Sequence, residues 1–136
     1  MGAWGKGALE NDDACDYADM IADGKDLSGL ERTLDTAIQA GEDYLEVSDG
    51  AEALAAGEIV ARLLGRPGAL TPRTAKIDEW ISGLKQAPGA PLVDKAVQAV
   101  TRVMTEPSEL MEIWIDSDNF DDWQDGVEDL LHRLKP

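Results

Sequence analysis

Apolar residues recur every three or four positions along most of the chain, which is the period of an α-helix with one buried face. Turn signals rich in glycine, proline and asparagine separate these stretches. We expect seven helical segments, at about residues 12–23, 29–40, 49–64, 72–84, 92–104, 107–115 and 119–134. Only the stretch 44–47 alternates as a strand would, and it is short and isolated. The pattern therefore predicts an all-α protein.

The third segment is unusual because its first half consists largely of small residues. Ser48 or Asp49 is expected to cap it, and small side chains between Ala51 and Gly57 would let a neighbouring helix approach closely. No stretch of 30–45 residues repeats itself, and the connections are short. We therefore expect an irregular orthogonal bundle of about six to seven short helices in a single domain, residues 1–136.

The first eleven residues are rich in glycine and surround one tryptophan, Trp4. Glycine permits unusual dihedral angles and close backbone approach, so we expect segment 1–11 to pack on the bundle with Trp4 sealing the core. A groove beside Trp4 that holds a small ligand or peptide is the alternative. The segment lacks the spacing of a nucleotide-binding loop and does not follow a strand.

The formal charge of −16 is spread unevenly along the chain. Residues 1–60 hold 15 acids and 3 bases, residues 61–105 hold 3 acids and 7 bases, and residues 106–136 hold 10 acids and 2 bases. Such a charge repels nucleic acid and anionic lipid and would attract a basic protein. The basic side chains of the middle region are few, with little aromatic interleaving, so we expect them to complement the acidic segments within the fold or between subunits.

Carboxylates cluster at two places that we consider as metal-binding sites. Asp12, Asp13 and Asp16 begin the first segment and could offer oxygens to a divalent metal, although such clusters usually face solvent. Asp121 and Asp122 follow an aspartate-rich turn whose spacing fails the calcium-loop pattern, so we expect them at the exposed start of the last helix.

Other catalytic arrangements lack support in the sequence. His132 is the only histidine and Cys15 the only cysteine, which is too few for the usual zinc site. Glu58 lies in the most apolar segment, where a pair with Arg62 four residues on is the simplest account. We predict no cofactor and no metal site. One cysteine, the absence of a signal-peptide pattern and the absence of a long apolar run favour a cytoplasmic protein without membrane contact.

The opening MGAWGKGALENDDACDYADMI resembles a bacterial family known as domain of unknown function 4259, whose members begin with Met-Gly-Ala-Trp-Gly-x-Gly followed by Asn-Asp-x-Ala. Residues 44–46, the alanine-rich third segment, and residues 108–110 with Trp114 are also similar to it. One departure is Ala8-Leu9, where the family pattern has a bulkier pair such as Pro-Phe. The resemblance implies a small cytoplasmic bacterial protein and no established activity, cofactor or catalytic residue.

Three hypotheses follow for the function. The first is a non-enzymatic protein-binding module, such as an immunity or inhibitor protein for a basic partner, whose binding residues would be Trp4 and the aspartates of the two clusters. The second is a carboxylate-based enzyme that depends on a divalent metal and uses Asp12, Asp13 and Asp16, with Glu58 as a further candidate. The third is a small-ligand protein with a pocket near Trp4.

Overall fold

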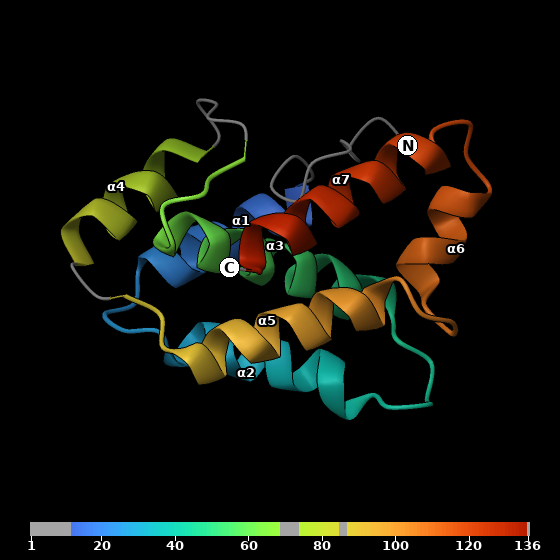
Figure 1. Cartoon of the computed structure of the whole chain (residues 1–136), viewed down its shortest axis with the longest axis horizontal. Coiled ribbons are helices and arrows are strands. Elements are labelled where there is room, and N and C mark those ends of the chain that lie inside the picture. The colour runs from blue at the N-terminus through green and yellow to red at the C-terminus, as the bar shows by residue number, and fades with distance from the viewer. Residues whose placement is uncertain (1–11, 69–73, 85–86, 136) are drawn as a thin grey trace.

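Seven α-helices make up most of the part of the chain that the computed structural model describes, residues 12–68, 74–84 and 87–135 (Figure 1). Within these ranges no strand occurs, and the one β-type pairing is an isolated parallel bridge between Leu45 and Ser108. The all-α prediction is confirmed. The helices are α1 (Asp12–Ala22), α2 (Ser28–Gln39), α3 (Val47–Leu63), α4 (Ala75–Leu84), α5 (Ala90–Val103), α6 (Glu109–Ile115) and α7 (Phe120–Leu134).

Helix α3 is the centre of the bundle. Its residues 50–62 are buried, except for the half-buried Glu52. Each of the other six helices packs against it, and Figure 1 shows it in the middle of the molecule, with α7 above it and α5 below it. A helix that is apolar on nearly every side has no solvent face, so its neighbours must enclose it.

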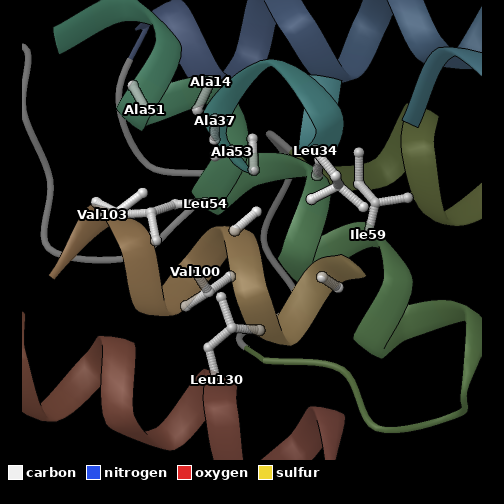
Figure 2. Packing of buried hydrophobic residues seen from close by; sticks show 14 of the residues in the cluster. Ala14, Leu34, Ala37, Ala51, Ala53, Leu54, Ile59, Val100, Val103 and Leu130 are labelled. Atoms are coloured by element: carbon white, nitrogen blue, oxygen red, sulfur yellow. The ribbon is translucent and has the colours of Figure 1, made fainter. Parts of the chain in front are cut away.

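The small residues of α3 bring α5 close, as the sequence predicts. A Cβ atom built on Gly57 would lie 2.7 Å from Cγ2 of Val100, a residue of α5 that is fully buried. Figure 2 shows Val100 between Leu54 of α3 and Leu130 of α7. The absence of a side chain at Gly57 therefore sets the distance between the two helices.

Aromatic packing joins α6 to α7. The rings of Trp114 and Trp123 stack with centroids 6.1 Å apart, and Phe120 lies 5.9 Å from Trp123. Both tryptophans are buried in the core, as expected from their positions on the apolar faces of their helices. Offset stacking of this kind adds to the free energy gained from burying the rings.

Helix α4 is covered less well than its apolar periodicity predicts. Ile77 is buried, but Trp80, Ile81 and Leu84 are only half-buried. The apolar spacing of this helix alone would place all four in the core. Three of them stay partly exposed because α4 lies at the edge of the bundle, where its main neighbours are α1 and α3. The indole nitrogen of Trp80 instead donates a hydrogen bond to the carbonyl of Gly24.

Most predicted helix starts differ from the observed ones by one to three residues, and two of these differences have a clear cause. Helix α3 begins at Val47, before the expected caps Ser48 and Asp49, because the backbone N–H of Val47 donates to the carboxylate of Glu109 at 2.8 Å. Helix α6 begins after Ser108, whose hydroxyl accepts from the N–H of Met111. The contact of Glu109 with the start of α3 comes from another helix, so it leaves no local sequence signal.

Tyr17 links α1 to α2. Its ring is buried, and its hydroxyl donates a 2.7 Å hydrogen bond to Oγ1 of Thr33. Burial raises the pKa of Tyr17 to about 12; the hydrogen bond to Thr33 acts in the opposite direction, and the charge of Glu52 adds to the increase. The folded protein therefore favours the neutral phenol more strongly than the unfolded chain does.

None of the helices in the described ranges is sufficiently long and apolar to cross a lipid bilayer.

We predict opposite effects for the same substitution at two helical glycines. Gly57→Ala should lower the free energy of unfolding by about 1–2 kcal/mol, because the clash with Val100 exceeds the gain in helix propensity. Gly83→Ala in α4 meets no atom within 4 Å and should raise it by about 0.5–1 kcal/mol. Urea denaturation measures both, and equal stabilisation by the two variants would contradict the close contact of α3 with α5.

We predict a loss of stability at alkaline pH that depends on Tyr17. The phenol of the unfolded chain ionises near its ordinary pKa of 10.0, whereas the folded state resists ionisation up to about 12. The stabilising contribution is complete below pH 10 and should fall by about 2–3 kcal/mol as the pH approaches 12. Tyr17→Phe cannot ionise, so its unfolding free energy should decline less over this interval. An equal decline of the unfolding free energy in the wild type and in Tyr17→Phe would show that Tyr17 does not cause the loss of stability.

Candidate interaction surface

Arg102 of α5 organises the end of the molecule at which α6 lies. Its guanidinium donates to four backbone carbonyls: Gly41 at 2.9 Å, Asp43 at 2.6 Å, Thr105 at 2.7 Å and Pro107 at 2.9 Å. These carbonyls belong to the α2–α3 loop and the α5–α6 connection, which lie at the right of Figure 1. A rigid planar donor with five N–H groups can hold two loops together in this way.

The same two loops pair directly with each other. Leu45 donates its N–H to the carbonyl of Pro107 at 3.1 Å and accepts from the N–H of Glu109 at 2.9 Å. Leu45 and Ser108 are fully buried beneath this pairing. The weakly alternating stretch 44–47 therefore forms a β-bridge at one residue only, Leu45. Its partner, Ser108, lies directly before α6. Residues 41–47 and 105–118 form a surface that we call the acidic end.

Large apolar side chains are exposed at the acidic end. Tyr44 is 49% exposed and Ile115 is 47% exposed. The hydroxyl of Tyr44 donates to Oε1 of Glu112 at 3.3 Å, and Glu112 and Ile115 are three residues apart on α6, hence neighbours on one helix face. Tyr44 and Ile115 thus lie on either side of the Glu112 carboxylate, and hydrogen bonds hold this surface rigid.

Acidic side chains surround these apolar groups. The exposed acids of the two segments are Glu42, Asp43, Glu46, Glu106, Glu112, Asp116 and Asp118. The pKa of Tyr44 is raised, mainly by partial desolvation and then by the negative charges of Glu109 and Glu112. The electrostatic potential at the acidic end is therefore negative, and α7 begins next to it (Figure 1).

The candidate residues from the sequence fall in separate places. Asp121 and Asp122 are exposed in the first turn of α7, as expected. Asp16 is exposed on α1. Trp4 and segment 1–11 lie outside the described residues, as do the side chains of Asp12 and Asp13, so their predicted roles stay predictions. In the described part of the chain, no three histidine, cysteine, aspartate or glutamate side chains converge as a metal site.

Glu58 is the centre of an ionic network that the sequence reveals only in part. It is 4% exposed, and its pair with Arg62 at 3.1 Å is confirmed. Arg133 of α7 binds it with two hydrogen bonds, at 2.8 and 3.0 Å, and the N–H of Gly68 adds a third at 2.9 Å. Arg62 then reaches Asp78 of α4 at 2.7 Å. The network therefore joins α3, α4, α7 and the turn after α3.

The described cations of the middle region make contacts inside the fold. Besides Arg62 and Arg102, Arg66 donates to the carbonyls of Arg133 and Lys135, Lys76 pairs with Asp23, and Lys95 pairs with Asp35. Arg62, Lys76 and Lys95 thus pair with acids within the chain, as expected of the basic region. Arg102 is a cation at the acidic end itself, where it binds backbone carbonyls and not carboxylates, so the exposed acids around it outnumber it and leave a negative charge.

Sequence reasoning missed Arg102, Arg133 and the surface residues Tyr44 and Ile115. Arg102 and Arg133 act on groups that are distant in the sequence, so no local spacing marks them. Tyr44 and Ile115 each carried a weak signal. Tyr44 stood in the alternating stretch, and Ile115 ended an apolar run whose buried members are Leu110, Met111 and Trp114.

Comparison with known proteins identifies one family. The model of the family described as a domain of unknown function (DUF4259) matches residues 2–126. No curated protein matches the chain. No solved structure matches it either.

We predict that neutralising Glu58 strongly destabilises the fold. Glu58→Gln removes the charge that compensates Arg62 and Arg133, and loss of one partner of a buried ion pair costs about 3–5 kcal/mol. Asp129→Asn is the matched control, because Asp129 also binds Arg133, at 2.9 Å, but is exposed. Its cost should stay below about 1 kcal/mol. Similar losses in urea denaturation would show that the network does not depend on Glu58.

Proposed function

We propose that this chain, which belongs to the DUF4259 family, is a cytoplasmic protein-binding module that docks a basic partner on its acidic end. The observation that carries the proposal is the presence of the exposed Tyr44 and Ile115 within a rigid group of exposed acids that outnumber the one cation among them, Arg102. Aromatic and aliphatic anchors inside a charged rim are typical of protein interfaces. A chain of charge −16 would also steer a basic partner toward it.

The rigidity of the surface favours binding. Arg102 fixes both loops through their carbonyls, and Glu109 fixes the start of α3. A preorganised surface loses less conformational entropy when a partner docks, so more of the contact energy appears as affinity. The partner would present lysine or arginine side chains around an apolar patch that covers Tyr44 and Ile115.

The proposal predicts that two kinds of substitution at the acidic end weaken capture of the same partner. The tagged protein is incubated with a lysate of the cells that produce it, and captured proteins are quantified at low and high salt. Ile115→Ser should weaken binding about 30-fold by removing an anchor. Glu112→Lys combined with Asp116→Lys should remove the salt-sensitive part of binding by reversing the local charge.

Matched controls lie on α1. Met20 is 61% exposed, and Asp16 and Asp19 are exposed beside it. Met20→Ser, and Asp16→Lys combined with Asp19→Lys, change hydrophobicity and charge by similar amounts and should leave capture unchanged. A partner that tolerates the α6 variants but is lost with the α1 variants would refute docking at the acidic end. Helical content measured by circular dichroism checks that each variant is folded.

A further inference from the structure

A hollow lies between α1 and α4, away from the acidic end. It is shallow and largely open to solvent, with a volume of about 590 Å³. Trp80 and Leu84 line it, and these are two of the three residues of the α4 apolar face that the core leaves half-buried. Ala22 and the two glycines Gly24 and Gly83 complete its apolar wall. The uncovered part of the α4 face thus borders a space large enough for a ligand.

Trp80 is held in place at this hollow. Its indole N–H donates to the carbonyl of Gly24 at 2.9 Å, which fixes the ring between the two helices. Because that hydrogen bond already satisfies the polar atom of the side chain, the ring offers apolar surface to whatever enters. A flat, apolar group is the best match for an indole ring fixed in this way.

The charged side chains around the hollow favour an anion. Lys25 and Lys76 both line it, and Glu79 is the single acid among its described lining residues. Lys76 also pairs with Asp23 at 3.0 Å, but both side chains are largely exposed, so this pair is weak and can exchange for a ligand. A positive lining is unusual for a chain with so large a negative charge.

We propose that the α1–α4 hollow binds a small aromatic anion, with its ring against Trp80 and its acidic group near Lys25 and Lys76. The site is distinct from the acidic end. In Figure 1, α4 lies at the opposite end of the molecule from α6. Binding there neither requires nor excludes a basic protein partner at α6.

The test compares two fluorescent probes that share one ring system. Anilinonaphthalene sulfonate carries a negative charge, and N-phenylnaphthylamine lacks the sulfonate. The sulfonate should bind the whole chain with one-to-one stoichiometry and at least about tenfold more tightly than the neutral probe at low salt. Failure of the sulfonate to bind, or equal affinity for the two probes, would overturn the proposal.

Three variants locate the probe. Gly83→Leu adds a side chain where no atom lies within 4 Å, so it should occupy the hollow and abolish binding without unfolding the protein. Lys76→Glu should weaken binding of the sulfonate and leave the neutral probe unaffected. Lys135→Glu makes the same charge change outside the hollow and should have little effect. Sulfonate binding that survives both Gly83→Leu and Lys76→Glu would place the probe elsewhere and overturn the proposal.

Discussion

The arrangement of the described helices depends on the enclosure of α3. A helix without a solvent face must be covered on every side, and here six helices of modest length cover it. Gly57 sets how closely α5 approaches, and the other small residues of α3 allow the rest of the shell to form around a narrow helix. Short helices at varied directions satisfy this constraint better than long parallel ones, which accounts for the irregular shape of the bundle.

Enclosure of α3 also determines how charge is distributed. Glu58 and Arg62 lie on its buried stretch and would be costly without partners, so α4 and α7 supply Asp78 and Arg133. Arg62 and Arg133 thus form ion pairs in the interior, and Arg102 binds backbone carbonyls. The protein therefore has a rigid acidic end around α6 and a less completely packed end around α4.

The sequence predicts what depends on local spacing. The periodicity of each helix and the pair of Glu58 with Arg62 involve residues within two helical turns of each other. The close approach at Gly57 was predicted in the same way, from the run of small residues around it. Arg133 was missed because it binds Glu58 from 75 residues away. Trp80 was misplaced because periodicity identifies an apolar face but cannot show whether a neighbour covers it. The roles predicted for Trp4, Asp12 and Asp13 concern side chains beyond those described.

Amide hydrogen exchange measured residue by residue tests most directly whether the enclosed α3 is the common support of the fold. We predict that amides of residues 53–62 exchange only through global unfolding, with an exchange free energy equal to that from denaturant titration. Amides of α4 should open at a clearly lower free energy, because α4 is the least covered helix. Exchange of α3 at a lower free energy than α2 or α7 would contradict this account.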